Sequence, residues 1–572
     1  MKLNLFLLLG MLVYFPTCIY AQWLQIGSDI EGRATLEYSG RSVALSDDGQ
    51  IFAVATPSNE GAAIFRGYVD VYQLVNGVRQ QLGQRIYGEG SNDHAGHEIS
   101  LSGDGSRLAI SAPYNDASGT NAGHVRVYEY DAVSSSWVQL GADIDGLAAG
   151  DQFGSAVCLS YNGNAVAIGA MNNDAGGTDA GQLSVFSYQN GVWVLTGQRI
   201  SGAAAGYGLG FSVSINDAGS RVAVGGRLAD GNGTNAGEVR VFDNLNGTWT
   251  QVGQTILGAA AGDYMGNTVT FDKDGSTLAV GAPLNDANGT DAGVIQVFKL
   301  QGGSWVQMGQ ALLGARAGDK NGSSVSLTSD GLMISTGAIG NDDNGTDAGH
   351  SRVYRYDNAQ SSWVQYGQSI NGQSANSLSG FCTRLSTNGQ YLIVGAPYND
   401  DNGAESGQSR LFRYNCSANL DLSISQSGND LIANQANASY QWQSCNFGSI
   451  SGANGQSFSP LSNGYYSVII SQNGCVDTSN CYSFILSSTS ESELVAKDLR
   501  VFPNPSQGHL IIQTPKIEEV RLYNSLGQLV LASHYQNESQ IELNLQQLPA
   551  AIYLLEVNTA LGRRTQKVIL SK

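Results

Sequence analysis

One glycine-marked segment recurs seven times before residue 415, and this regularity restricts the possible folds more than any other feature of the chain. The segment reads Trp-Val-Gln-x-Gly or a variant of it, and its closing glycine returns at intervals of 56 or 58 residues. Two more glycines, one before the first apolar strand and one in the turn after it, repeat in phase. Three markers in register indicate seven copies of one unit. The closing glycines are Gly27, Gly83, Gly141, Gly197, Gly253, Gly309 and Gly367.

Each copy is predicted to hold four short strands, because Val, Ile and Phe alternate with small or polar residues in four segments. In one unit these segments are 267–271, 277–281, 294–298 and 305–309. Asp274-Gly275 between the first two is typical of a tight hairpin. Four-stranded units repeated in this way indicate the blades of a propeller. We therefore expect an all-β chain with a seven-bladed β-propeller over residues 22–415.

The two ends of the repeat region complete each other. The first Trp strand, 23–30, has no earlier strands to join, and the last unit, 381–414, has no Trp strand after it. We predict that the N-terminal strand is the outer strand of the seventh blade. This pairing would close the ring and remove an exposed sheet edge.

The units resemble the FG-GAP repeats of integrin α-subunit propellers and their bacterial relatives. The resemblance rests on Phe153-Gly154 with Gly169-Ala170-Met171, and on Gly-Ala-Pro at 281–283 and 395–397. Integrin-type repeats carry acidic calcium loops between strands one and two. Here that link is a short turn such as Ser46–Gly49, so the resemblance does not extend to calcium at that place.

Acidic residues recur in the loops at one end of the predicted ring. The loop between strands two and three and the loop that enters the next blade emerge at the same end. We predict that this face contacts the ligand; the structural alternative is that these side chains bond nearby amides in Asx turns. The acidic residues are Glu60, Asp93, Asp116, Asp151, Asp174, Asp230, Asp263, Asp286, Asp319, Asp342 and Asp400.

Oxygen-rich Asn-Asp-x-Asn-Gly-Thr-Asp segments in these loops could ligate Ca²⁺, which binds oxygen ligands. The candidate ligands are Asp286, Asn288, Asp291, Asp342, Asn344 and Asp347. The formal net charge of −19 argues against nucleic acid as a partner. We expect an extracellular glycan or protein ligand instead.

Catalytic motifs are weak in this chain. His94 and His97 lack the His-Glu-x-x-His order of a helical zinc site, so we interpret both as exposed loop residues. The least regular loops are 61–66 and Arg227–Asp230. Near-identical loops favour binding over catalysis, and the predicted function is non-enzymatic binding or adhesion. The alternatives are a secreted polysaccharide-active enzyme with a site in the channel, and a passive spacer.

The N-terminus predicts secretion. Met1-Lys2 precedes the mostly apolar run 3–14, which is typical of a signal peptide over residues 1–21. No later run reaches the roughly 20 apolar residues of a spanning helix, so we expect no transmembrane segment.

Four cysteines follow the propeller, in a region where secretion permits disulfides. They are Cys416, Cys445, Cys475 and Cys481. Three pairings are open to them. Region 416–486 resembles the immunoglobulin-like modules of bacterial surface proteins in Tyr440-Gln-Trp442 and Asn-Gly-Cys475, which implies a small β-sandwich. Cys158 and Cys382 are interpreted as buried thiols inside blades.

Residues 487–498 are rich in Ser and Glu and predict a linker. The following region, 499–572, resembles the type A sorting domain of the type IX secretion system found in Bacteroidota. The matching motif residues are Pro503, Asn504, Pro505, Gly508, Gly527 and Tyr553. The resemblance implies a C-terminal β-sandwich, contact with the type IX secretion machinery, and a location outside the cell or on its surface.

Overall fold

The computed structural model describes residues 22–58, 65–415, 420–445, 448–472, 475–486, 499–524, 527–559 and 562–571. Over these ranges the chain is all-β, as expected, and forms two compact units, Met1–Asn419 and Leu420–Lys572. In the same ranges there is no helix of the length and apolarity that membrane crossing requires. The predicted signal peptide 1–21 and linker 487–498 lie outside the described residues, so both stay predictions.

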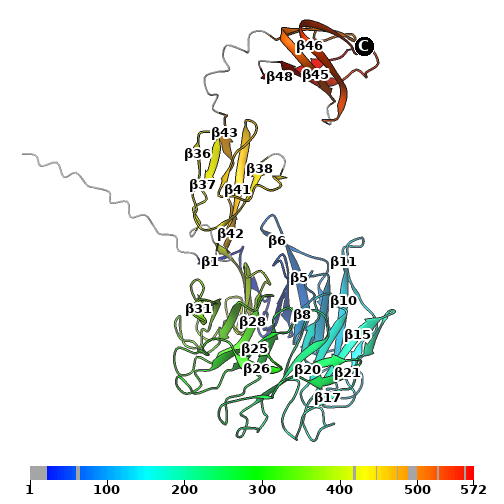
Figure 1. Cartoon of the computed structure of the whole chain (residues 1–572). Helices are drawn as coiled ribbons and strands as arrows, with labels where there is room; N and C mark the ends of the chain where they lie inside the picture. The colour runs from blue at the N-terminus through cyan, green and yellow to red at the C-terminus, as the bar shows by residue number, and fades with distance from the viewer. Residues whose placement is uncertain are drawn as a thin grey trace, which may run out of the picture. The chain divides into compact units, whose positions relative to one another are not determined.

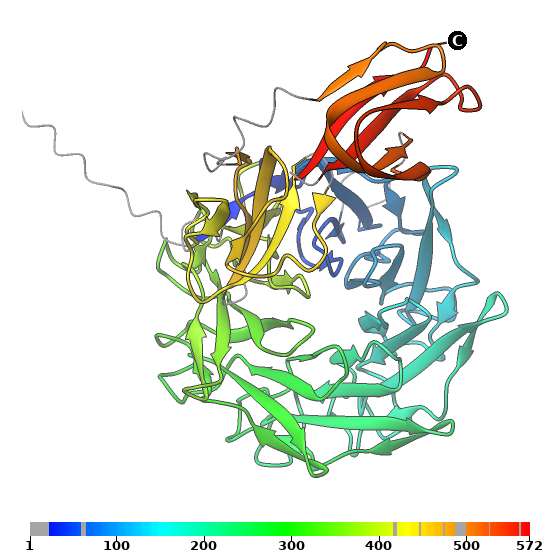
Figure 2. The same cartoon turned by 45° about the horizontal axis from the view of Figure 1, so that its top comes forward.

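The first unit contains seven five-stranded sheets of one topology among its described residues (Figures 1 and 2). The innermost strands are β3 (Val43–Leu45), β8 (Ile99–Leu101), β13 (Phe153–Leu159), β18 (Ser212–Ile215), β23 (Thr268–Phe271), β28 (Asn321–Leu327) and β33 (Cys382–Leu385). The second strands are β4 (Ile51–Thr56), β9 (Arg107–Ala112), β14 (Ala165–Ala170), β19 (Arg221–Gly226), β24 (Thr277–Ala282), β29 (Met333–Ala338) and β34 (Tyr391–Ala396). The third strands are β5 (Tyr68–Val75), β10 (His124–Asp131), β15 (Gln182–Gln189), β20 (Glu238–Leu245), β25 (Val294–Gln301), β30 (His350–Asp357) and β35 (Gln408–Asn415).

Two further sets of strands complete the sheets. The outer strands are β1 (Gln22–Gln25), β6 (Val78–Gln81), β11 (Ser136–Gln139), β16 (Val192–Leu195), β21 (Thr248–Gln251), β26 (Ser304–Gln307) and β31 (Ser362–Gln365). The short fifth strands are β2 (Ile30–Glu31), β7 (Ile86–Tyr87), β12 (Ile144–Asp145), β17 (Ile200–Ser201), β22 (Ile256–Leu257), β27 (Leu312–Leu313) and β32 (Ile370–Asn371). These fifth strands pair with the start of the third strand and were not expected from the sequence.

The closing glycine of each unit allows the fifth strand to form. Gly253 follows the outer strand β21 with a φ of +72°, a left-handed conformation that lets the chain turn back toward β20. A Cβ at Gly253 would lie 2.7 Å from Cδ1 of Trp305 in the next blade. A tryptophan of the next blade packs in this way on six of the seven closing glycines; a Cβ at Gly27 would meet nothing within 4 Å.

The ring closes through the two ends of the repeat region. β1 pairs antiparallel with β35, and Trp23 lies opposite Tyr414. Each innermost strand contacts the innermost strands of both neighbouring sheets, and β3 contacts both β8 and β33 (Figure 2). The apolar residues of adjacent sheets form shared cores; one core joins Val43 and Phe52 of the first sheet to Ile393 of the last. Burial of apolar surface between blades therefore holds the ring together.

A tryptophan–glutamine clasp links neighbouring blades. Trp23 donates from Nε1 to the carbonyl of Tyr366 at 3.1 Å and from its backbone N–H to Oε1 of Gln368 at 2.9 Å. Gln368 Nε2 donates back to the carbonyl of Trp23 at 2.8 Å. The clasp that closes the ring thus has the same hydrogen bonds as the internal ones. The equivalent internal pairs are Trp137 with Gln84, Trp249 with Gln198, Trp305 with Gln254 and Trp363 with Gln310.

His350, at the start of β30, predicts a pH-dependent stability. It is 2% exposed, and burial lowers its pKa from 6.5 to about 4, while nearby Asp343 acts in the opposite direction. The unfolded chain binds a proton here below about pH 6.5 and the folded chain only below about pH 4, so stability falls as the pH drops through this window. Between pH 7.5 and pH 5 this histidine should remove about 2 kcal/mol from the free energy of unfolding.

Urea unfolding at both pH values, with His350→Gln beside the native chain, measures this effect. The variant should lose less stability on acidification. An equal loss in both proteins would show that His350 is not the group responsible.

The region after the propeller contains two sheets. One is formed by β36 (Ile424–Ser427), β37 (Asp430–Ala433) and β40 (Ser457–Phe458). The other is formed by β38 (Ser439–Ser444), β39 (Gly448–Ser449), β41 (Gly464–Gln472), β42 (Cys475–Thr478) and β43 (Tyr482–Phe484). Trp442 is 0% exposed and stacks on Phe458 of the other sheet. The immunoglobulin-like assignment stays a prediction.

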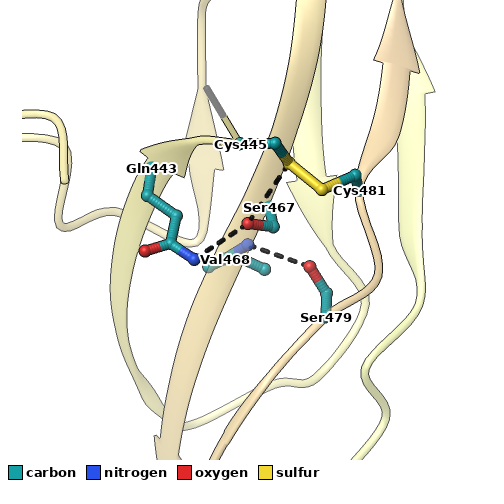
Figure 3. Close-up of a disulfide and its surroundings, with 6 residues drawn as sticks. All are labelled: Gln443, Cys445, Ser467, Val468, Ser479 and Cys481. Carbon is teal, nitrogen blue, oxygen red and sulfur yellow. Dashed lines mark hydrogen bonds between the residues drawn. A yellow bond between two sulfur atoms is a disulfide. The ribbon is translucent and has the colours of Figure 1, made fainter. Parts of the chain in front are cut away.

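One disulfide is present among the described residues, between Cys445 and Cys481 (Figure 3). It lies beside β41, where Cys445 Sγ contacts the hydroxyl of Ser467 and the Ser479 hydroxyl accepts the backbone N–H of Val468. The bond therefore ties the segment after β38 to the segment before β43. Cys416 and the side chain of Cys475 lie outside the described residues.

The tail forms one sheet of β44 (Arg500–Phe502), β45 (His509–Tyr523), β46 (Leu529–Asn544), β47 (Ile552–Thr559) and β48 (Gly562–Ile569). The predicted motif residues connect its edges. Asn504 donates to the carbonyl of Lys567 at 2.7 Å and accepts the N–H of Ile569 at 2.9 Å. The Tyr553 hydroxyl donates to the carbonyl of Pro549 at 3.0 Å. The motif therefore fixes the start of the domain to its last strand.

Candidate functional site

The aspartates of the blade-entry loops are buried and bonded. Asp263 is 3% exposed, and its Oδ2 accepts the N–H of Ala260 and the side-chain amide of Asn285, each at 2.9 Å. The second bond joins an entry loop to the loop between strands two and three of the same blade. The same arrangement recurs at Asp93 with Asn115, Asp151 with Asn173 and Asp319 with Asn341. These four carboxylates therefore hold loops together.

The aspartates of the loops between strands two and three are exposed and form turns. Oδ1 of Asp286 accepts the N–H of Asp291, five residues later, at 2.8 Å. The same bond is made by Asp116, Asp174, Asp230, Asp342 and Asp400. One carboxylate oxygen is thus used by the backbone, and ligand contact by these residues stays a prediction. Glu60 lies outside the described residues.

The candidate calcium ligands belong to the same turns. The side-chain amide of Asn288 donates to the carbonyls of Gly314 and Ala315, and that of Asn344 to the carbonyls of Gly372 and Gln373. These asparagines therefore tie each loop to the following entry loop. Asp347 supplies its N–H to Asp342, as Asp291 does to Asp286. Calcium at this place stays a prediction.

A different metal-type cluster, Glu89, His124 and Asp143, is found among the described residues. The guanidinium of Arg126 forms ion pairs with both carboxylates, at 2.9 Å to Asp143. Burial lowers the pKa of His124. A resident cation already compensates this cluster, so we do not assign a metal to it.

A cavity of about 670 Å³ lies where the innermost strands converge. Its volume falls within the usual range of about 300–1,000 Å³ for small-molecule sites. At the end where the entry loops arrive, it is lined by half-buried aromatic and basic side chains, which we call the channel mouth. The channel mouth consists of Arg41, His97, Tyr114, Phe211, Arg227, Tyr264, Lys320 and Phe381.

The channel mouth is where the seven copies differ from one another. A second repeated glycine stands at the start of each innermost strand. The residue that follows this glycine is variable, although the glycine itself is constant. These residues are Arg41, His97, Ser155, Phe211, Asn267, Ser323 and Phe381. All seven line the cavity. A position that the repeat does not restrain is free to contact a ligand.

A second variable position, two residues before the same glycine, adopts left-handed backbone. The residues and their φ values are Tyr38 (53°), His94 (54°), Gln152 (51°), Gly208 (60°), Tyr264 (58°), Lys320 (54°) and Leu378 (50°). Glycine fits this conformation without strain and is used once, whereas the other residues cost about 1–2 kcal/mol each. Retaining large side chains there in six copies points to a use for them.

Arg227 is the centre of one half of the channel mouth. Its guanidinium lies 3.7 Å from the ring centroid of Phe211 and 5.7 Å from that of Tyr264. Nη1 donates to Oδ1 of Asn267 at 3.3 Å, and Nε has no hydrogen-bond partner among the described residues. Burial lowers the pKa of Arg227. Neither Arg227 nor Lys320 forms an ion pair with a described carboxylate, so this half carries uncompensated positive charge.

Arg41 is the centre of the other half. It lies over the ring of Phe381 at 5.4 Å, and its Nη2 donates to Nε2 of His97 at 2.9 Å. Burial, and then the charge of Arg41, lower the pKa of His97 well below its usual value. His97 is therefore neutral, with its proton on Nδ1, which has no hydrogen-bond partner within the described ranges.

The expectation that His94 and His97 are exposed loop residues was wrong. Both are half-buried, and His94 stacks on Phe65 and meets Tyr114 edge to face. The convergence of innermost strands from all blades buries them, and this convergence is invisible in a local pattern. Arg227 lies in one of the loops that the sequence already showed to be least regular.

Deeper in the channel, Arg384 of β33 forms an ion pair with Glu98 at 3.2 Å. Burial raises the pKa of Glu98, although Arg384 and Arg41 act in the opposite direction. The predicted free thiols, Cys158 and Cys382, also line this part, and burial raises the pKa of both. Glu98 is the only carboxylate among the described residues that line the cavity.

Two family models match parts of the chain. Residues 500–571 match the secretion system C-terminal sorting domain, and residues 249–298 match the FG-GAP repeat. The tail is a secretion sorting domain. It directs export by type IX secretion, so the protein is found at the cell surface or outside the cell. None of the curated proteins matches the chain.

The solved structures that this chain is similar to share little sequence with it. A protein from Lactobacillus plantarum is 11% identical with a TM-score of 0.39, over 60% of this chain and 86% of its own. The β-propeller domain of the trilobed protease from Pyrococcus furiosus is 8% identical with a TM-score of 0.35, over 62% and 90%. The GH74 xyloglucanase from Xanthomonas campestris is 11% identical with a TM-score of 0.39, over 95% and 81%.

Proposed function

We propose that this protein is a non-enzymatic binding protein that acts outside the cell, and that its channel mouth binds an extracellular glycan or protein ligand. The observation that carries the proposal is the placement of the variable residues of the repeat. Positions that differ between copies gather around one cavity, while the glycines, tryptophans and aspartates that repeat are used in packing and turns. A scaffold with one distinctive surface is suited to recognition.

The composition of the cavity favours binding over the enzymatic alternative. Glycoside hydrolysis by the usual route needs two carboxylates about 5–9.5 Å apart. The described lining offers Glu98 alone, and Arg384 already pairs with it. A passive spacer would not need strained, uncompensated side chains at the channel mouth.

Tyr264→Ala should weaken ligand binding at least tenfold without unfolding the propeller, because its ring lines the cavity on a loop that already accepts glycine in the fourth blade. The measurement is binding of the secreted chain to glycan and extracellular-protein arrays. Tyr161→Ala is the matched control, since Tyr161 lies in a hairpin turn at the opposite end of its blade and is 42% exposed. Equal binding by both variants would remove the channel mouth from consideration.

A further inference from the structure

We propose that the channel mouth binds the anionic end of an acidic glycan chain, with the carboxylate or sulfate group of the sugar held by Arg227 and Lys320. This inference rests on the proposed function and names its ligand class. It starts from the charge of the molecule, since a chain with a formal net charge of −19 places unpaired cations in its central cavity.

Arg227 has the properties of an anion-binding group. Phe211 and Tyr264 hold its plane, and the only described hydrogen bond it makes is with the neutral Asn267. Its Nη2 makes no hydrogen bond with a described residue, and a planar guanidinium matches the geometry of a carboxylate or sulfate. Other arginines of the propeller are used differently; Arg221 and Arg126, for example, pair with aspartates. Arg227 therefore retains a charge that a ligand can neutralise.

Lys320 adds a second cation from a neighbouring part of the ring. It enters the cavity lining from the loop before β28, two blades after the one that carries Arg227. Its backbone is left-handed, with a φ of 54°, and glycine occupies the equivalent position in the fourth blade. Tyr264 occupies the same position in the blade between them. A cation, an aromatic ring and a second cation thus follow one another around the cavity.

The rest of the lining suits a sugar. Rings of Tyr264, Phe211 and Tyr114 offer flat apolar surfaces. Hydroxyl and amide side chains complete the wall. They include Ser155, Ser212, Ser214, Asn267, Thr268 and Ser323. Ser155, Ser212 and Ser214 already bond to the backbone. A hydroxyl can both donate and accept, so such groups retain capacity that a polyhydroxylated ligand can use.

The exposed aspartates of the neighbouring loops limit how a polyanion can approach. Asp116, Asp174, Asp230, Asp286, Asp342 and Asp400 emerge at the same end of the ring as the channel mouth. Like charges repel a long acidic chain laid across this face. A single chain end that enters the cavity meets the cations instead, so we infer recognition of a terminus.

The test is calorimetric titration of the secreted full-length chain with short oligogalacturonates, sulfated oligosaccharides, neutral malto-oligosaccharides and a polyglutamate peptide. One of the two acidic sugars should bind, and the pair of titrations tells carboxylate from sulfate. Arg227→Gln and Lys320→Gln should each weaken binding at least tenfold, and added salt should weaken it in the native chain. Lys273→Gln, which removes a cation that lies over Tyr161 at the other end of the ring, should leave it unchanged.

The outcomes separate the two proposals. Neutral sugars that bind as tightly, with no effect of Arg227→Gln, would overturn the anionic inference; the binding function would survive if Tyr264→Ala still abolished that binding. A preference for polyglutamate would replace the glycan by an acidic peptide. Binding of long polygalacturonate but not of short oligomers would refute recognition of a chain end. Failure of all acidic sugars to bind would overturn the inference, and insensitivity of every ligand to all channel-mouth variants would overturn both proposals.

Discussion

Trp23→Ala should destabilise the propeller by about 4 kcal/mol, because a buried tryptophan side chain is lost together with the hydrogen bond that its indole donates, while the backbone bonds to Gln368 remain. Trp23 is 2% exposed, packs edge to face on Tyr414 and donates to Tyr366 from the indole. The side chain also fills the space above Gly367, where a Cβ would lie 2.9 Å from its Cδ1. Urea unfolding followed by tryptophan fluorescence and circular dichroism measures the loss.

The matched control is Trp249→Ala, which removes the equivalent indole inside the ring. Trp249 is 4% exposed and makes the same three hydrogen bonds, with Gln198 and the carbonyl of Thr196. Its strand is covalently continuous on both sides, whereas β1 is held to the last blade only by pairing and packing. We therefore expect a similar loss of stability in both variants, but faster proteolysis at residues 22–31 in Trp23→Ala alone. Equal protection of that segment in both would contradict closure through β1.

Asp263→Ala should cost about 3 kcal/mol of stability, because it leaves the buried amide of Asn285 and the N–H of Ala260 without their acceptor. Asp263→Asn keeps an oxygen at that place and should recover part of the loss. Thermal unfolding of the three proteins gives the comparison. If the aspartate instead serves as a ligand contact, both variants will lose binding while their unfolding midpoints stay close to that of the native chain.

Local patterns were enough to predict the architecture. The hairpin Asp274-Gly275, the strands around it and the Trp-Val-Gln-x-Gly segments are short-range signals, and repetition in phase makes them reliable. The sorting motif at Pro503–Pro505 is equally local, and the matching family model confirms the tail. The fifth strands were missed because two-residue strands such as Ile256–Leu257 carry too little pattern of their own and exist only by pairing with β20.

The site was harder to predict because its residues are the ones that differ between the seven copies, whereas the fold is indicated by the residues that repeat. Repeated acidic residues such as Asp263 and Asp286 were predicted to contact the ligand. Their described hydrogen bonds are made within and between loops. Comparing the copies column by column would have marked Arg41, Tyr264 and Lys320, since these positions vary beside constant glycines. Arg227 was visible in this way, as part of an irregular loop.

The amino-acid sequence alone determined the repeat, its four main strands, the pairing of its two ends and the export tail. Each of these follows from short motifs or from the spacing at which they recur. Only the tertiary structure decided which side chains share a site. Arg41, His97, Arg227 and Lys320 come from separate blades and meet in one cavity because the innermost strands converge on a common axis. That convergence also half-buries them, and burial lowers the pKa of His97 and of Arg227.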